Sequence, residues 1–454
     1  MEALTANSVS LVVMLISLVV LVVSIIKFKV HPVYALIYVA ILSAIAFGFP
    51  LQHVVTTVTG GFGGTIGSIG IVIILGCTMG VILEETGAAL VLANTILKFV
   101  GKKNSALAMA ISGYLVSIPV FSDSAIVILS PVARALSARG NIPLFGILGA
   151  LNAGILATHT MVPPTPGPLA AAGTLGADLG LVIALGLVSS LFYTAAATIY
   201  CTNKSMLTKF PQVSHMTNVE SVLNDDYTIK SAKKLPNAGL TFAVILVPVL
   251  LICLNSFAKI GLPAEDPILT YLGFIGHPVI SLTFGVILAL FLDTSIFSKE
   301  KVYDWFNKSV DTSGFIILAT GAAGAYGAVL RMSGVGTYLG NLIAETPLPA
   351  VFVPFLVAVL LSVSNGSATV SLLTGSAIIL PLMPALGLHP VIATLAIAAG
   401  SSFFYHANAS HFWVVVKSND LDMKTGFAIV SVPSAIGACA GFVAVWIMSM
   451  FLTV

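Results

Sequence analysis

Residues 117–132 read SIPVFSDSAIVILSPV, and the carboxyl group of Asp123 lies between two serines in this otherwise apolar stretch. An ionised side chain at the centre of a bilayer costs about 2.5–3.5 kcal/mol on insertion scales, and acids in such positions commonly serve ion or proton pathways. Asp123 is therefore a candidate proton or cation ligand. The alternative is a structural role as the cap of the following half-helix, which Ser122 or Ser124 could also fulfil.

Three further polar stretches interrupt apolar segments: THTMVPPTPGP at 158–168, SVSNGSATVS at 362–371 and FYHANASHF at 404–412. The first contains four prolines and a glycine, which cannot continue a helix. Irregular backbone at membrane depth is tolerated only where protein or a water-filled cavity satisfies its polar groups. Together with FSDSA at 121–125, these breaks are predicted to line one shared site, with Asp123 facing the GSATV tip of the other half of the chain.

Half-helices that begin at the breaks would direct free N–H groups and positive dipole ends inward, and this arrangement favours a bound carboxylate. None of the four breaks contains Lys or Arg, so helix dipoles and polar side chains would have to hold an anion. The candidate binding residues are Ser122, Asp123, Ser124, His159, Thr160, Pro164, Thr165, Gly167, Ser364, Asn365, Gly366, Ser367, Thr369, His406 and Asn408.

Each of these groups also has a purely structural interpretation. Small hydroxyl residues in membrane helices often only permit close helix packing. That interpretation is weaker here because Ser-Ala recurs at both tips, at 124–125 and 367–368. For His159, a functional role and the capping of a helix end have equal weight. His406 and His411 are weaker candidates, because we expect them near the cytoplasmic surface.

The composition places these residues in a membrane protein. Of the 454 residues, 58% are hydrophobic and only 8% are charged, whereas a soluble domain has about 25% charged residues. The apolar run 8–26 exceeds the roughly 18 residues that a spanning helix needs, and it is too long for a signal peptide. A net charge of +2 gives no reason to expect a nucleic-acid partner. The scattered cysteines form no CxxC pair, so we expect packing roles and not a disulfide or metal framework: Cys77, Cys201, Cys253 and Cys439. No cofactor is expected.

The sequence predicts an all-α membrane protein with about ten transmembrane helices and two re-entrant helical hairpins. The predicted spans lie near 8–26, 31–49, 66–84, 142–157, 178–200, 238–256, 276–292, 313–331, 388–405 and 427–452. The two interrupted stretches 104–138 and 349–384 are the predicted hairpins, and the polar segment 201–237 is predicted to be a cytoplasmic linker.

The positive-inside rule sets the orientation of these segments. Lysines after the first helix place the N-terminus outside. Basic residues flank both ends of 104–138, so both ends should be cytoplasmic, and the tip of this hairpin is predicted at Pro119–Ser124. The flanks of 349–384 lack basic residues, which predicts entry from outside. Glu84 and Glu85 are expected to be surface charges at the cytoplasmic face. The basic residues that set this orientation are Lys27, Lys29, Lys98, Lys102, Lys103, Arg134 and Arg139.

The two halves of the chain also match in sequence, since GVILEETGAALVLANTI at 80–96 aligns with GAVLRMSGVGTYLGNLI at 327–343. Two hairpins that enter from opposite sides make an inverted repeat the best interpretation, and such repeats are typical of secondary transporters. The expected first repeat is 1–200 (scaffold helices 8–84, hairpin 104–138, broken helix 142–168), followed by the linker 201–237. The expected second repeat is 238–454 (scaffold helices 238–331, hairpin 349–384, broken helix 388–412).

Several motifs resemble the gluconate permease (GntP) family of the ion transporter superfamily over nearly the whole chain. They are GGFGGTIGSIGIVIILG (60–76), ETGAA (85–89), SIPVF (117–121), PPTPGP (163–168), GSATV (366–370) and HFWVV (411–415). The resemblance implies a symporter of gluconate or related small hydroxy-carboxylates, usually coupled to protons. It also implies two re-entrant hairpins, an elevator-like movement and a homodimer in the cell's inner membrane.

The chain departs from the family pattern around the expected site. It has Phe121-Ser122-Asp123 where members often have a bulkier FFE/D-type sequence, and Thr165 where many have histidine. Near the C-terminal end, the segment 406–413 lacks an acid that is common in the family. These departures favour the hydroxy-acid class over gluconate specifically.

The leading hypothesis is a proton-coupled symporter in which Asp123 binds the proton. Sodium coupling is the alternative, because serine hydroxyls, an amide and free carbonyls at the tips could form an oxygen cage with Asp123. A channel would have polar faces along several helices, whereas these polar residues are confined to breaks. An enzyme would need a nucleophile–base pair or a metal motif such as HExxH, and the sequence contains none.

Overall fold

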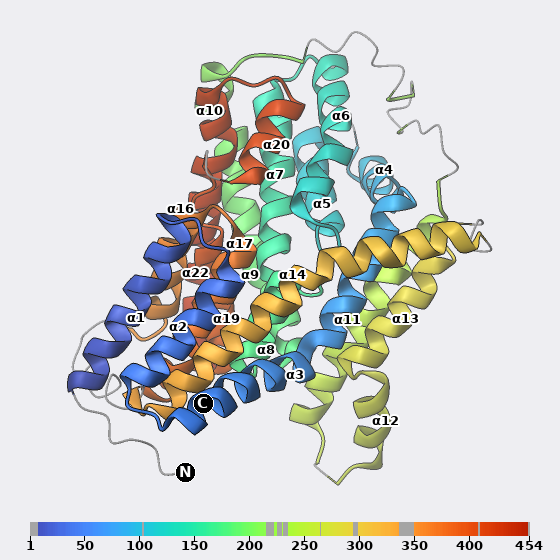
Figure 1. Ribbon diagram of the computed structural model, residues 1–454. Coiled ribbons are helices and arrows are strands. Elements are labelled where there is room, and N and C mark those ends of the chain that lie inside the picture. The colour runs from blue at the N-terminus through green and yellow to red at the C-terminus, as the bar shows by residue number, and fades with distance from the viewer. Residues whose placement is uncertain are drawn as a thin grey trace.

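The computed structural model describes residues 8–101, 104–214, 222–224, 229, 235–263, 265–293, 298–335, 349–406 and 409–452. These residues form a bundle of α-helices, which confirms the predicted all-α class (Figure 1). The first half contains α1 (Ser8–Ile26), α2 (Pro32–Ala46), α3 (Leu51–Glu85), α4 (Ala88–Val100), α5 (Ser105–Val116), α6 (Ser122–Gly140), α7 (Leu144–Met161), α8 (Pro166–Leu175), α9 (Leu179–Thr202) and α10 (Lys204–Lys209).

The second half begins with α11 (Ala238–Gly261), α12 (Pro267–Ile275), α13 (Pro278–Leu290) and α14 (Lys299–Met332). It continues with α16 (Phe352–Asn365), α17 (Ala368–Ile379), a 3₁₀ turn (Leu380–Leu382), α18 (Met383–Leu386), α19 (Pro390–Ser401), α20 (Ser410–Ser418), α21 (Met423–Gly426), a π-helical turn (Phe427–Ser431) and α22 (Val432–Ser449).

Within the described residues, seven helical segments are long and apolar enough to cross a membrane, or eight if the bent pair α12–α13 forms one span. The sequence predicted about ten spans. Part of the difference arises because α2 has 15 residues and α19 has 12, both below the length that a full crossing needs. The finer count of spans and hairpins stays a prediction.

Two long helices, α3 and α14, pack against each other along the bundle (Figure 1). α3 has 35 residues and is therefore about 52 Å long, far more than the roughly 30 Å of hydrocarbon. The predicted segments 66–84 and 313–331 cover only the C-terminal, more apolar parts of these helices. Glycine permits their close approach, since a Cβ atom at Gly324 would lie 2.0 Å from the Thr65 hydroxyl oxygen.

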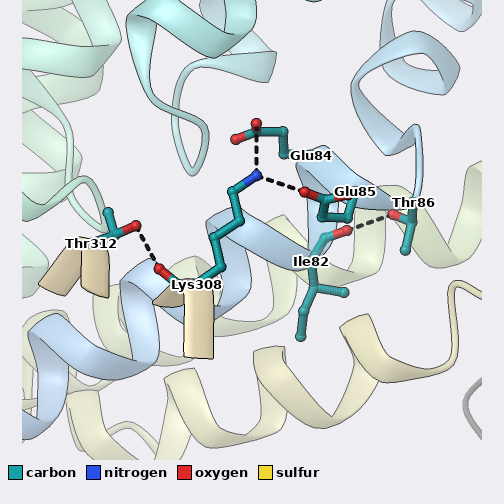
Figure 2. A network of polar contacts seen from close by, with 6 residues as sticks. All are labelled: Ile82, Glu84, Glu85, Thr86, Lys308 and Thr312. Carbon is teal, nitrogen blue, oxygen red and sulfur yellow. Dashed lines mark hydrogen bonds and ion pairs between the residues drawn. The ribbon is translucent and has the colours of Figure 1, made fainter. Parts of the chain in front are cut away.

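An ion-pair cluster joins the C-terminal end of α3 to the N-terminal part of α14, as Figure 2 shows. The Lys308 ammonium lies 2.6 Å from a Glu85 carboxylate oxygen and 3.3 Å from one of Glu84. The two glutamates, expected to be surface charges, are thus ion-paired within the fold. Partly exposed pairs of this kind contribute at most about 1 kcal/mol each, so the cluster aligns the two helices more than it stabilises them.

The polar breaks separate helices in the structure. α5 and α6 are separated by 117–121, α7 and α8 by 162–165, α16 and α17 by 366–367, and α19 and α20 by 402–409. Prolines account for the second break, and Gly366 accounts for the third because its φ of 68° lies in the left-handed region. The first break overlaps the predicted tip at Pro119–Ser124.

The ends of α3 and α14 repeat the same local geometry. Thr86 and Ser333 each bond a carbonyl of the preceding turn through the side chain. The following glycines, Gly87 and Gly334, have φ angles of 76° and 71°. These four residues occupy equivalent positions in the two aligned segments 80–96 and 327–343.

The most buried helix is α7, which lies in the middle of the bundle (Figure 1). All 18 of its residues are buried. Its small residues allow α5 to approach closely, because a Cβ atom at Gly154 would lie 2.1 Å from the Ala110 carbonyl oxygen and 2.7 Å from the Tyr114 backbone nitrogen. α7 therefore holds its neighbours and its own functional side chains at short, well-defined distances.

We expect Gly154→Ala to lower the free energy of unfolding by about 1–3 kcal/mol, because the added methyl group meets backbone atoms that cannot move away. Thermal unfolding of the purified protein in detergent measures the loss. Gly63→Ala is the matched control, since a Cβ atom there has nothing within 4 Å. Equal melting temperatures for the two variants would contradict this account of the packing.

Candidate functional site

Asp123 lies in the first turn of α6, directly after the first break. One carboxylate oxygen lies 3.1 Å from His411 Nδ1, and the other accepts a hydrogen bond of 2.9 Å from the Ser410 hydroxyl. Ser122 is 3.4 Å from the first oxygen. The Asp123 side chain is 43% exposed, whereas His411 is nearly fully buried. The acid therefore joins α6 to the start of α20 in the other half of the chain, whereas the sequence analysis expected it to face the GSATV tip.

His411 continues this chain of contacts into α7. Its Nε2 lies 2.7 Å from the Asn152 side-chain oxygen, and the Asn152 amide nitrogen donates to the Ile429 carbonyl at 3.4 Å. Ile429 belongs to the π-helical turn before α22, and π-helical turns frequently occur at functional sites. His411 is buried, with its ring edge-on to that of Tyr405.

Asn152 and Ser410 were not among the residues predicted for the site, and His411 was only a weaker candidate. Asn152 did offer a signal, since it is a lone amide within an apolar helix, and such a group must find a partner when it is buried. Ser410 and His411 belong to a break that the sequence had already marked. Their partner could not be read from the sequence, because it lies in the other half of the chain.

His159 lies at the end of α7, beside the second break. It is 8% exposed, and its Nδ1 has no hydrogen-bond partner in the described part of the chain. Its ring centroid lies 6.1 Å from that of Phe121, at the first break. A buried polar atom without a partner costs about 1–3 kcal/mol. This nitrogen is therefore available to a ligand.

The predicted hydroxyl residues are mostly engaged with their own helices. Thr160, Thr165 and Ser364 each donate to a carbonyl of the preceding turn, at 2.9, 2.7 and 2.6 Å. Ser367 accepts from the Val370 backbone nitrogen and caps α17. A hydroxyl whose hydrogen is used in this way can still accept a hydrogen bond from a ligand.

The remaining predicted residues are placed as follows. Ser124 is half-buried in the first turn of α6. Pro164 packs against α3, since a Cβ atom at Gly76 would lie 2.8 Å from the Pro164 carbonyl oxygen. Asn408 and the side chain of Asn365 lie outside the described residues.

The four breaks contact one another in a ring. The first and second meet through Phe121 and His159, and the first and fourth through Asp123 and its partners. The second and third breaks approach each other at Gly167 and Thr369, because a Cβ atom added at Gly167 would lie 3.6 Å from the Thr369 hydroxyl oxygen. The third meets the fourth where His406 Nε2 lies 2.9 Å from the Val363 carbonyl oxygen.

Four helices, α6, α8, α17 and α20, begin at this ring, so their positive ends gather there. The N-caps of α6, α8 and α20 make no side-chain capping bond, which leaves first-turn N–H groups for other partners. In α8, Gly167 supplies such an N–H between two prolines. This arrangement, beside the unpaired His159 nitrogen, can hold an anion without a lysine or arginine.

A cavity of about 320 Å³ approaches the site from the side on which α6 and α20 end. Arg134 and Asp420, which form an ion pair of 3.6 Å, belong to its lining. Ile429 lines the same cavity. The cavity thus extends to the residue whose carbonyl bonds Asn152.

A bundle of membrane-crossing helices whose polar breaks meet inside the protein is the architecture of a multi-pass membrane transporter. Residues 9–451 match the GntP family permease, and the chain belongs to this family. The resemblance seen in the sequence is thereby confirmed.

The relatives of the chain are permeases, which agrees with a transporter and not an enzyme. An uncharacterized permease of Haemophilus influenzae is 36% identical over 431 residues, covering 92% of this chain and 88% of the relative. The gluconate permease of Pseudomonas aeruginosa is 30% identical over 429 residues, covering 94% of each chain. The inner membrane permease YgbN of Escherichia coli K12 is 32% identical over 439 residues, covering 93% of this chain and 94% of the relative.

The solved structure of MtrF from Neisseria gonorrhoeae, presented as one of a class of antimetabolite efflux pumps, has a similar fold. Its TM-score is 0.67 with 14% sequence identity, and the match covers 95% of this chain and 97% of MtrF. At this identity the likeness concerns the fold alone.

The two buried histidines should respond differently to the same substitution. His411→Leu removes the partner of the Asn152 side-chain oxygen and the imidazole that faces one Asp123 carboxylate oxygen, so we expect the free energy of unfolding to fall by about 1–3 kcal/mol. His159→Leu removes an unpaired buried nitrogen, so we expect no loss of stability. Thermal unfolding of both variants in detergent measures the difference, and an equal loss in both would contradict the assigned contacts.

Proposed function

We propose that this permease is a proton-coupled symporter of small hydroxy-carboxylates such as gluconate or related sugar acids. The observation that supports the proposal best is the ring of four breaks, with its uncapped helix starts and the unpaired nitrogen of His159. Relatives that are named gluconate permeases support the same substrate class.

In this proposal, the substrate carboxylate binds the first-turn N–H groups at the ring. Helix starts bind anions well because their N–H groups and dipoles point at the ligand. The Nδ1 atom of His159 then forms a hydrogen bond with one substrate hydroxyl, and the hydroxyl oxygens of Thr165 and Thr369 accept hydrogen bonds from other substrate hydroxyls. A polyhydroxy acid matches this set, because it combines one negative charge with several donors and acceptors.

Coupling to protons follows from competition for the same donors. The Asp123 carboxylate takes the hydrogen bond of Ser410 and faces His411. An ionised Asp123 therefore occupies donors that an anionic substrate could use, and it repels the substrate as well. When Asp123 binds a proton, the donors are released and the repulsion ends, so substrate and proton bind together.

The size of the repulsion is sufficient for coupling. Two like charges 4 Å apart interact by about 4 kcal/mol at an effective dielectric constant of about 20. Since about 1.4 kcal/mol corresponds to a tenfold change, a substrate carboxylate held at that distance would bind nearly a thousandfold more weakly beside an ionised Asp123.

Sodium coupling is the alternative, and the contacts of Asp123 count against it. Sodium needs several oxygen ligands, whereas one Asp123 oxygen faces an imidazole nitrogen and the other accepts a hydroxyl hydrogen. A cation beside Asp123 would have to displace these groups, while a proton fits between the acid and the imidazole.

We also propose the predicted inverted repeat with two re-entrant hairpins, an elevator-like movement and a homodimer. The equivalent ends of α3 and α14, with Thr86-Gly87 matching Ser333-Gly334, support the repeat. The proposed location is the inner membrane with the N-terminus outside, supported by the basic residues of the sequence and by the inner membrane relative YgbN.

Asp123→Asn should abolish accumulation of the substrate driven by a pH gradient, because the amide cannot bind and release the proton. Uptake of labelled gluconate and related hydroxy acids into proteoliposomes measures this, with a pH gradient or a sodium gradient imposed separately. Asp266→Asn is the matched control, since Asp266 only caps α12 at an exposed position and asparagine can do the same. If proton-driven accumulation survives in Asp123→Asn, the transported proton does not bind at Asp123. Accumulation that is driven only by sodium would favour sodium coupling.

Ligand binding should raise the melting temperature more at about pH 6 than at about pH 8, because Asp123 must be protonated when the anion binds. A screen of hydroxy-carboxylates by thermal shift, with and without sodium, measures the effect. We expect His159→Leu to weaken binding at least tenfold without loss of stability. An unchanged affinity in this variant would exclude His159 from the binding site.

A further inference from the structure

Asn152 can adopt only one amide orientation in its surroundings. The Ile429 carbonyl oxygen accepts hydrogen bonds and cannot donate one, so the Asn152 amide nitrogen must face it, at 3.4 Å. The amide oxygen then faces His411 Nε2 at 2.7 Å. The reversed amide would place two oxygens against each other. The Ile429 carbonyl therefore requires a hydrogen on Nε2 of His411.

This requirement determines what the other ring nitrogen can do. A neutral imidazole carries one hydrogen, so with Nε2 protonated its Nδ1 is a bare acceptor. Nδ1 lies 3.1 Å from an Asp123 carboxylate oxygen, which is also an acceptor when ionised. Two facing acceptors repel each other unless a proton lies between them. That proton makes either an imidazolium beside a carboxylate or an imidazole beside a carboxylic acid.

We propose that Asn152 is a positioning residue that holds His411 in its Nε2-protonated form, so that Asp123 and His411 share one proton. The transported proton then belongs to the pair and not to Asp123 alone. This consequence for coupling rests on the proposed function, whereas the hydrogen placement on His411 does not.

Other groups around the pair come from each neighbouring element. α7 contributes His159, a second titratable group in the last turn of that helix. The segment 402–409 contributes Tyr405, whose ring lies edge-on to His411 at 5.8 Å. Hydroxyl groups of α6 and α20 contact the acid, and the π-helical turn contributes only the carbonyl of Ile429. Arg134, paired with Asp420, lies three turns further along α6.

The direction of the effect follows from the deprotonated state. In the native protein, loss of the shared proton leaves the His411 lone pair facing the Asp123 carboxylate. In Asn152→Leu the imidazole can exchange its hydrogen to Nδ1 and donate to the carboxylate, so the deprotonated pair is relaxed. The variant should therefore hold the proton about tenfold more weakly, and its uptake should decline about one pH unit lower than in the native protein.

Nitrogen NMR of the purified protein with isotope-labelled histidine tests the proposal directly. The His411 signals are identified by their absence in His411→Gln. In the native protein we expect a hydrogen on Nε2 at every pH and the loss of a single proton as the pH rises. A neutral His411 that carries its hydrogen on Nδ1 in the native protein would overturn the proposal.

A variant of Asn152 sharpens the test. Asn152→Leu removes the acceptor that faces Nε2 and should move the hydrogen to Nδ1 at high pH. If the hydrogen position is the same in the leucine variant as in the native protein, Asn152 has no positioning role. Uptake that is driven by sodium would overturn the proposed function and leave the NMR result as it is, so the two failures are distinguishable.

Discussion

A helix that stops inside a membrane leaves N–H and C=O groups that lipid cannot satisfy, and this constraint governs the interior of the protein. Breaks separate four pairs of helices in the described residues, and each break lies against other breaks or against a neighbouring helix. α3 provides part of the cover through glycine, since Cβ atoms at Gly76 and Gly80 would lie 2.8 Å from the Pro164 and 2.4 Å from the Pro119 carbonyl oxygens. The site therefore forms where the backbone is most irregular, because only mutual contact makes that backbone tolerable in this medium.

The same constraint explains how the proposed anion site can exist without a basic side chain. The helix starts that meet at the ring provide partial positive charge and free N–H groups, and these are fixed in direction by the helices behind them. A lysine at this place would pair with Asp123 and remain charged throughout a transport cycle. With histidine instead, the acid faces a ring nitrogen that can either donate or accept a hydrogen bond.

Contacts between the two halves of the chain recur throughout the structure. Asp123 meets α20, Gly167 meets α17, and Lys308 joins α14 to the end of α3. Under the proposed function, a ligand at the ring would touch both halves at once. A rearrangement that changes the contact of Asp123 with His411 would then also change the environment of the substrate, and this would couple the binding of a proton to that of a substrate.

The sequence by itself determined the membrane class, the all-α fold and the places of the four breaks, because apolar run length and the conformational limits of proline and glycine act locally. It also singled out Asp123, since an acid in such a run is costly wherever the chain folds. Only the tertiary structure decided which residue faces that acid. Asp123 and His411 lie 288 residues apart, and their contact depends on how α6, α7 and α20 pack. In our proposal, the position of the hydrogen on the imidazole depends further on one carbonyl of a π-helical turn. Contacts between groups so distant in the chain cannot be predicted from periodicity or composition.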